Sequence, residues 1–514
     1  MRYQAYPSED HPCFSHLLIC SSAPLEAERP YRRDLDSEDI DYSTERVKAL
    51  RRDLNNFFSK PGAGSRERRM RVVVRVHGYN VPLKSVKKEY ESDQKRFQED
   101  AKSMIVNSPE DYVLFIHYAW PSERIGAGGP LHWIPAMPIG LLVLFLLGAI
   151  LINVTSAVSN VIGELLLGIG ITLTLLRAVT YFRDRDRAGS FGVYDAVEMV
   201  RALHHIVQEI SCETDYIPRL QRDDAERISL SFVGHSMGTF LTTALIRVLS
   251  NVFDAEADSH LWKGNPLAGP FAAAGDPIPV SPEQQEKQRL QRSRIGELFV
   301  LDRLILVAAD IPVWTITPGR SNELASCLRR FRHTFLFVND ADMVLRMAST
   351  LANYFVFPSG TRMGGYRLGN LSLSGRGKAN GYGWRAADMR EVKLHGGLRS
   401  KLLCGEPFRC PPRIGYPLNV IDCTDYTDDG RHLSAFTATH ALLRPFNYAA
   451  TLVLMLLAPL GIGQIDSHGG YFRGRFCSHL IDELALRGLN GNQAPSPQIQ
   501  AGLKKHRISW ITVS

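Results

Sequence analysis

The chain has 514 residues, which is longer than one minimal domain needs and leaves room for a large core with insertions. Its hydrophobic share of 45% is ordinary for a globular protein, and its formal net charge is only +7. No dense basic stripe with interleaved aromatic residues is visible, so we expect no nucleic-acid partner. The eight cysteines include no C-x-x-C pair, which favours reduced thiols over a zinc site or a disulfide framework.

Short apolar segments alternate with amphipathic segments along most of the chain, after an irregular stretch at 1–42. The apolar segments predict strands over residues 71–76, 112–118, 228–233, 303–309, 334–338 and 417–421. The amphipathic segments predict helices over residues 43–58, 83–104, 193–210 and 237–249. This alternation is typical of a mainly parallel sheet with helices on both faces, so the expected fold class is α/β.

Four stretches interrupt the alternation, and we interpret them as insertions into one core. They are an apolar stretch at 125–190, a polar stretch at 254–297, a Gly/Arg-rich stretch at 358–412 and a second apolar run within 424–466. The core then comprises residues 70–124, 191–253, 298–357 and 413–514, and residues 1–69 form an N-terminal extension.

The first apolar insertion has no Asp, Glu, Lys or Arg from Ile125 to Gly163, a run of 39 residues. A membrane-spanning helix needs about 20 apolar residues, so the run predicts a transmembrane hairpin with helices over 133–154 and 158–182. Arginines flank the hairpin and its connecting turn has none, which predicts an inner or plasma membrane protein with its sheet on the cytoplasmic side. The alternative is a buried apolar cap over a cleft.

The strongest motif is Gly234-His235-Ser236-Met237-Gly238, which follows a predicted strand and opens a predicted apolar helix. This setting is that of a nucleophile elbow, in which small flanking residues permit a tight turn and the serine stands at the edge of the sheet. The helix N-terminus and the Met237 N–H group would then help to bind a developing oxyanion. The alternative is an ordinary Gly-rich turn between a strand and a helix.

A second motif, VRVHGYN at residues 74–80, ends an upstream strand. A glycine just past a strand lets the backbone bend and turn an N–H group toward the nucleophile. We therefore expect Gly78 and Tyr79 to supply the other oxyanion donor, and we interpret His77 and His235 as structural. The alternative for this motif is a simple turn at the end of a strand.

Together, VRVHGYN, YAWPS at 118–122 and GHSMG at 234–238 resemble an uncharacterised bacterial α/β-hydrolase family of lipase and esterase type. LVAADI at 306–311 and VNDADMVL at 338–345 also fit. The resemblance covers the core strands from about residue 70 to 350 and more weakly to 480, without the N-terminal 40 residues and the insertions. It implies an α/β-hydrolase fold and a Ser–His–Asp triad.

The resemblance places the acid of the triad after a late strand, in a pattern of Asp followed three residues later by Leu. Asp342 with Leu345 matches this spacing. Asp340 and Asp310 remain alternatives, since Asp310 also ends a strand. Helix capping is the other role open to each of these carboxylates.

The base follows the last strand in the chain order Ser, Asp, His. In the resembled family this histidine is followed closely by aromatic residues and then by a helix. Of the candidate histidines, His468 fits this pattern best, although a long insertion precedes it. His432 and His440 remain alternatives. The uncharged run at 445–465 could just span a bilayer with its 21 residues, which would carry His468 to the far side of the membrane. Because prolines interrupt the run, we expect a core, re-entrant or interfacial helix instead.

These residues predict a serine hydrolase that transfers an acyl group from an ester to water, with neither metal nor organic cofactor. A hairpin in the bilayer beside the site favours a lipid-like or other apolar ester over a polar small molecule. Two alternatives remain: an acyltransferase on the same fold, with an alcohol or amine in place of water, and a non-catalytic membrane scaffold.

Overall fold

The computed structural model of the protein describes most of the core and parts of the insertions. The described residues are 2–5, 14–21, 45–59, 69–104, 111–122, 146–154, 156–213, 227–249, 295–312, 327, 330–349, 367–370, 418–428, 431–435, 444–457, 465–487 and 495–513. The greater part of the expected polar stretch (254–294) and of the Gly/Arg-rich stretch (371–412) therefore lies outside the described residues.

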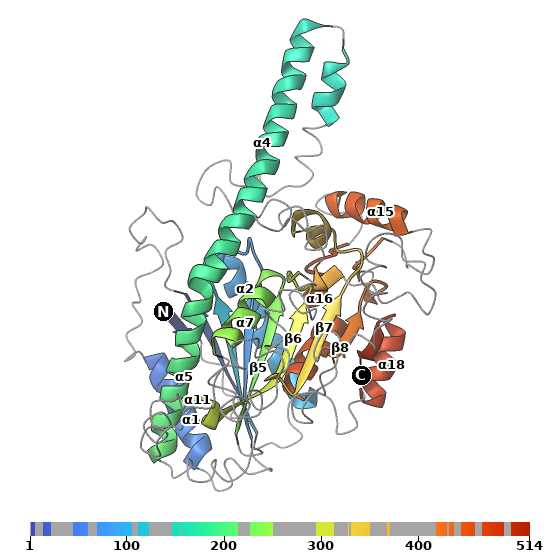
Figure 1. Cartoon of the computed structure of the whole chain (residues 1–514). Coiled ribbons are helices and arrows are strands. Elements are labelled where there is room, and N and C mark those ends of the chain that lie inside the picture. The colour runs from blue at the N-terminus through green and yellow to red at the C-terminus, as the bar shows by residue number, and fades with distance from the viewer. Residues whose placement is uncertain are drawn as a thin grey trace, which may run out of the picture.

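A nine-stranded sheet forms the centre of the molecule, in the order β1-β2-β4-β3-β5-β6-β7-β8-β11 (Figure 1). The strands are β1 (Arg2–Ala5), β2 (Phe14–Cys20), β3 (Met70–Val76), β4 (Tyr112–Ala119), β5 (Ile228–His235), β6 (Phe299–Val307), β7 (His333–Val338), β8 (Leu418–Asp422) and β11 (Ser509–Val513). Strands β2 to β8 pair in parallel, whereas β1 and β11 pair antiparallel with β2 and β8. The expected α/β class is confirmed, as a mixed and mostly parallel sheet.

Helices cover both faces of this sheet. One layer holds α1 (Glu45–Ser59), α5 (Val193–Glu213) and α7 (Met237–Val248); the other holds α2 (Leu83–Met104), α17 (Arg475–Leu486) and α18 (Pro497–Lys505). Side chains alternate between the faces, so in β3 Val72 and Val74 pack in the first layer while Val73 packs in the second. Burial on both faces explains why the central strands are almost continuously apolar in sequence.

The N-terminal segment expected to be irregular contributes β1 and β2 to the edge of the sheet, so that prediction was wrong. The side chains of Leu17, Leu18 and Ile19 in β2 are buried, because β2 pairs in parallel with β4 and is covered on both faces. Strand β11 was also not predicted. The remaining described elements are α11 (Ile295–Leu298), α15 (Arg444–Leu457), α16 (Gly470–Arg473), β9 (Thr427–Asp428), β10 (Arg431–His432) and two helical turns, Val344–Ser349 and Leu368–Asn370.

Helix α4 (Ala157–Arg187) projects from the body of the molecule and forms a helical hairpin with residues 146–152 (Figure 1). The two arms approach closely at two glycines, where a Cβ atom on Gly163 would lie 2.7 Å from the carbonyl oxygen of Gly148. At its other end α4 passes through a π-helical turn (Ala188–Gly192) into α5.

The two transmembrane helices expected in this insertion are not confirmed. Among the residues that the structure describes, no helix is long and apolar enough to cross a membrane. Residues 133–145, which make up most of the first expected span, lie outside the described residues. The second expected span, 158–182, falls within α4, which continues to Arg187.

Candidate active site

Ser236 occupies a strained turn between β5 and α7. Its backbone has φ 52° and ψ −123°, and a positive φ is uncommon for a residue other than glycine. Four hydrogen bonds hold the turn. Ser236 donates its N–H to the Val307 oxygen at 2.9 Å, and its own carbonyl accepts from Thr239 N at 3.0 Å, from the Thr239 hydroxyl at 2.5 Å and from Asp310 N at 3.3 Å. The end of β6 thus fixes the conformation of the serine.

The two glycines of the motif are required by close approach of the backbone. A Cβ atom on Gly238 would lie 2.5 Å from the carbonyl oxygens of both Val76 and His77, and one on Gly234 would lie 2.9 Å from the Cα atom of Thr239. Glycine at these positions therefore lets α7 begin directly against the end of β3. The turn has the geometry that the small flanking residues predict.

The loop after β3 lies against Ser236. A Cβ atom on Gly78 would lie 2.9 Å from the Cβ atom of Ser236, so glycine lets this backbone come closer to the serine than any side chain would allow. Tyr79 and Met237, the other two expected oxyanion donors, come from the same loop and from the first residue of α7. All three expected donors therefore belong to segments that adjoin the serine.

His77 supports this loop from within. Its ring stacks on Trp120 with the centroids 5.3 Å apart. The Trp120 backbone N–H donates to His77 Nε2 at 3.2 Å, so the proton is on Nδ1, which donates to the Gly78 oxygen at 2.8 Å. Burial lowers the pKa of His77 to about 4, which keeps the ring neutral. These contacts agree with the structural role that we expect for His77.

His468 and Asp342 form a hydrogen-bonded pair. The Nδ1 atom of His468 lies 2.7 Å from Oδ2 of Asp342, whose side chain is fully buried. The other oxygen of Asp342 accepts the backbone N–H of Leu345 at 3.0 Å. This bond gives a physical reason for the spacing of Asp and Leu in the sequence, because the third residue after the aspartate satisfies its second oxygen.

The surroundings of His468 act on its pKa in opposite directions. Burial lowers the pKa of the imidazole, but the charge of Asp342 and its hydrogen bond raise it, with smaller contributions from the charges of Asp466 and Asp310. The net effect is a pKa above the ordinary value. An imidazole held by a carboxylate in this way is suited to accept a proton at Nε2.

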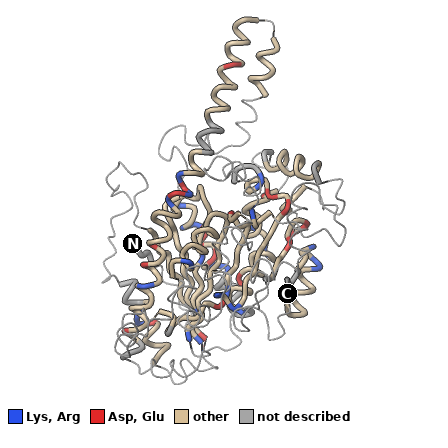
Figure 2. Tube along the Cα trace, viewed as in Figure 1, with Lys and Arg blue, Asp and Glu red and all other residues tan. Residues whose placement is uncertain are grey.

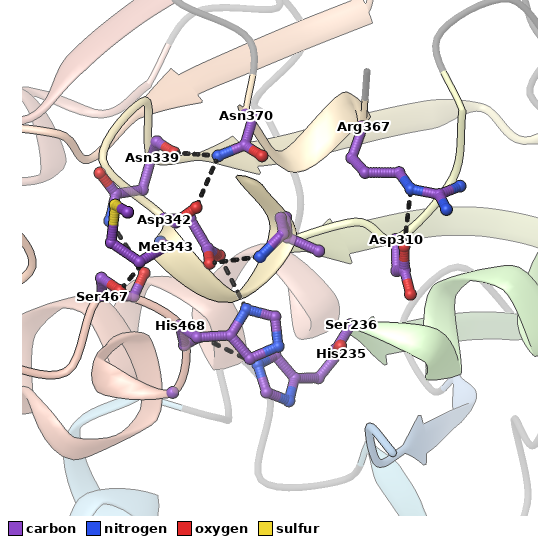
Figure 3. Close-up of polar contacts among 12 residues, drawn as sticks. His235, Ser236, Asp310, Asn339, Asp342, Met343, Arg367, Asn370, Ser467 and His468 are labelled. Atoms are coloured by element: carbon purple, nitrogen blue, oxygen red, sulfur yellow. Dashed lines mark hydrogen bonds and ion pairs between the residues drawn. The ribbon is translucent and has the colours of Figure 1, made fainter. Parts of the chain in front are cut away.

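Amide side chains hold the acid and base loops together (Figure 3). Asn339 donates from Nδ2 to the Ser467 oxygen at 2.8 Å, next to His468 in the chain. The Met343 N–H donates to Ser467 Oγ at 3.3 Å, and Asn370 donates to the Asp342 carbonyl oxygen at 3.1 Å. The sequence predicted no role for Asn339, Asn370 or Ser467, because their function depends on contacts between distant segments.

His235, the second residue of the GHSMG motif, contacts the base directly. Its Nε2 atom donates to the carbonyl oxygen of His468 at 3.0 Å, and the two ring centroids are 5.0 Å apart. Burial, followed by the nearby charge of His468, lowers the pKa of His235 to about 3, so its ring is neutral at physiological pH. His235 therefore helps to hold the backbone of His468 beside Ser236 (Figure 3).

The alternative acids have other partners. Asp310 pairs with Arg367, with Oδ1 and Nε 3.0 Å apart, and accepts the Tyr181 hydroxyl at 2.8 Å. Asp340 pairs with Arg346 at 3.0 Å and accepts the Tyr448 hydroxyl at 2.7 Å. Both carboxylates are thus engaged with arginine and tyrosine.

The alternative bases are His432 and His440. His432 lies in β10 with an exposed side chain, and His440 is outside the described residues. Among the candidates that the structure describes, the acid and base joined by a hydrogen bond are Asp342 and His468.

The Oγ atom of Ser236 is buried and has no hydrogen-bond partner within the described part of the chain, so no bond from Ser236 to His468 is formed here. In free enzymes such bonds are often long and tighten when substrate binds.

The arrangement brings together a serine on a strained turn, a histidine oriented by a carboxylate, and two backbone segments that adjoin the serine. Among the described residues, no group of three or more His, Cys, Asp or Glu side chains could hold a metal ion. Comparison of the chain with protein-family models, with curated proteins and with solved structures found no match in any of the three.

Proposed function

We propose that the protein is a serine hydrolase of the α/β-hydrolase type that cleaves an ester bond of a lipid-like or other apolar substrate. The observation that carries the proposal is the 2.7 Å hydrogen bond between His468 Nδ1 and Asp342 Oδ2 in the same site as Ser236. A serine becomes a nucleophile only when a base can take its proton, and that base must have the correct tautomer. Asp342 fixes the tautomer of His468 that leaves Nε2 able to accept.

In the proposed reaction, Ser236 Oγ attacks the ester carbonyl and its proton passes to Nε2 of His468. The N–H groups of Met237 and of the Gly78–Tyr79 segment bind the negative oxygen of the tetrahedral intermediate. Collapse of the intermediate breaks the ester C–O bond, and the imidazolium gives its proton to the departing alcohol. Water, deprotonated by His468, then releases the carboxylic acid and restores Ser236.

The preference for an apolar substrate rests on the hairpin. Exposed large apolar side chains cover its described part: Leu146, Leu147, Ile150, Ile152, Val154, Val158, Val161, Ile162, Leu165, Ile169 and Ile171. From residue 146 to residue 176 it has a single charged residue, Glu164 (Figure 2). An exposed apolar surface of this kind is costly in water and favourable in lipid.

We infer that the hairpin inserts into a membrane and holds the catalytic domain at its surface. The arginines that follow the hairpin, among them Arg183 and Arg185, favour the cytoplasmic side of an inner or plasma membrane. Helix α15 lies at the same end of the molecule as the hairpin (Figure 1). Its Phe446 and Val453 are also exposed, which suits an interfacial helix beside the site.

The test is an activity screen of the full chain, purified in detergent, against 4-nitrophenyl esters with acyl chains of increasing length. Ser236→Ala is the inactive control, and Ser478→Ala, a buried serine on α17, is the matched control. We expect hydrolysis that increases with acyl length and is lost only in Ser236→Ala. Product analysis with added alcohols and amines distinguishes hydrolysis from acyl transfer. Activity that persists in Ser236→Ala contradicts the proposal.

A further inference from the structure

The lower end of α4 forms part of the candidate active site. Tyr181, which is 2% exposed, donates its hydroxyl to Asp310 at 2.8 Å, and Asp310 in turn contacts the Ser236 backbone. The ring of Tyr181 meets that of Tyr79 edge to face, with the centroids 5.5 Å apart. The insertion that carries the exposed hairpin therefore reaches the loop expected to bind the oxyanion.

One turn further along α4, the fully buried carboxylate of Asp184 holds this loop directly. Its Oδ2 atom accepts the Asn80 N–H at 3.0 Å and the Ser122 hydroxyl at 2.8 Å. Ser122 Oγ in turn accepts the Val81 N–H at 3.3 Å. The other oxygen of Asp184 accepts from Arg183 at 2.9 Å, which balances the buried negative charge. Two successive N–H groups of the loop are thus tied to one carboxylate, the first directly and the second through Ser122.

The loop has a conformation that requires such support. Asn80 has φ 56°, in the left-handed region, which asparagine adopts more often than most residues other than glycine but less often than extended or helical backbone. Gly78, two residues earlier, lies against Ser236, so a change at Asn80 is transmitted to the N–H groups beside the serine. A hydrogen bond from an N–H group to a carboxylate is stronger than one to a neutral acceptor, and is suited to hold the loop in this conformation.

We propose that Asp184 is a positioning residue for the reaction: by binding the N–H groups of residues 80 and 81, it holds the loop in the conformation that directs the N–H groups of Gly78 and Tyr79 at the oxyanion. This inference rests on the proposed hydrolase function. Asp184 contacts the loop and not the reacting atoms. Because the oxyanion that the loop binds forms in the transition state, loss of Asp184 should lower kcat more than it raises KM. Misplacement of an oxyanion donor costs about 10² in turnover, with little effect on substrate binding.

The experiment compares Asp184→Ala, Asp184→Asn and Asp186→Ala in the full chain, with a soluble short-chain ester as substrate. Asp186 is exposed on the same helix and is the matched control. We expect Asp184→Ala to lower kcat about 10²-fold with little change in KM. Asp184→Asn retains an oxygen that can accept the Asn80 N–H and should recover most of this loss, and Asp186→Ala should resemble the wild type.

A second measurement uses a trifluoromethyl ketone, whose serine adduct carries the oxyanion, and a long-chain alcohol as a competitor that forms no adduct. Asp184→Ala should weaken the trifluoromethyl ketone about 10²-fold and leave the alcohol unchanged. If Asp184→Ala does not fold, Ser122→Ala, which breaks only the link to Val81, should show a smaller loss of the same kind. The inference is overturned if Asp184→Ala keeps the wild-type kcat, if it weakens the binding of both inhibitors equally, or if Asp184→Asn recovers none of the lost activity. A wild-type protein without any esterase activity overturns the proposed function instead.

Discussion

The Nδ1 atom of His468 lies 2.7 Å from the Oδ2 atom of Asp342, although 126 positions separate the two residues in the chain. The loops that carry them are fastened by Asn339, which donates to the Ser467 oxygen at 2.8 Å, and by Ser467 itself, which accepts from Met343 N. His235 adds a third connection, from the serine motif to the His468 carbonyl. The acid, the base and the serine are thus joined through backbone contacts as well as side chains.

Ser236→Ala should abolish covalent labelling by a fluorophosphonate probe. The reagent reacts with a serine whose proton is taken by a neighbouring base, and the strained turn at Ser236 presents such a serine. Gel fluorescence of the labelled protein measures the effect, with Ser478→Ala as a control that keeps wild-type labelling. Labelling that persists in Ser236→Ala would place the nucleophile elsewhere.

His468→Ala should lower kcat/KM by at least about 10⁴-fold, because no other group then accepts the serine proton. Asp342→Asn should cost a similar factor, since the amide no longer fixes the imidazole tautomer. His432, whose side chain is exposed, and His440 serve as controls, and their alanine variants should keep most of the activity. Activity that persists in His468→Ala and is lost in His432→Ala or His440→Ala would reassign the base.

The rate should depend on pH through the pKa of His468. Only the neutral imidazole can accept the serine proton, and the charge of Asp342 raises the pKa of His468 against the opposing effect of burial. Hence kcat/KM should be low at acidic pH, where His468 is protonated, and should rise with pH through a midpoint above 6.5. In Asp342→Asn, the residual activity should have its midpoint at lower pH. An unchanged midpoint in this variant would show that another group controls the profile.

The sequence identified the parts of this site whose geometry is local. Gly234 and Gly238 are needed by contacts within a few residues or with the adjacent strand end, and Leu345 satisfies Asp342 from three positions away. The central strands were predictable for a related reason, since a parallel strand buried on both faces is a short apolar run.

The parts that could not be predicted depend on distant contacts. Asp184 binds Asn80 across 104 positions, and in sequence it is one charged residue among several at the end of an apolar insertion. Strand β1 has only four residues, and β2 is one apolar run of seven residues that the sequence pattern did not separate from the irregular stretch around it. The hydrogen bonds donated by the side-chain amides of Asn339 and Asn370 likewise form only after the loops have come together.

Gly78→Ala should lower turnover about 10²–10³-fold, because the new methyl group would lie 2.9 Å from the Cβ atom of Ser236 and push the oxyanion loop away. The matched control is Gly168→Ala in α4, where an added Cβ meets no atom within 4 Å. Steady-state kinetics with a soluble ester, together with thermal unfolding of both variants, measures the effect. Equal turnover in the two variants would exclude this loop from the reaction.

The exposed apolar surface of the hairpin leads to a prediction about lipid binding. Val161 and Leu165 lie one turn apart on α4 and are 66% and 62% exposed, so glutamate at these positions should not disturb the protein core. A charged side chain within hydrocarbon costs about 2.5–3.5 kcal/mol, which corresponds to a decrease of about 10²-fold in partitioning for each substitution. We therefore expect Val161→Glu with Leu165→Glu to prevent flotation with phospholipid vesicles and to lower hydrolysis of emulsified long-chain esters. Hydrolysis of a soluble short-chain ester should stay at the wild-type rate.

The control for this experiment is Val248→Glu at the last residue of α7. Val248 is also an exposed valine, at 51%, and it lies at the opposite end of α7 from Ser236. Its replacement adds one negative charge, against two in the hairpin variant, without touching the hairpin, so vesicle flotation should be retained. If the hairpin variant floats as the wild type does, or if Val248→Glu abolishes flotation equally, the hairpin is not the lipid-binding element. In that case the exposed face of α15, with Phe446 and Val453, is the next surface to substitute in the same assay.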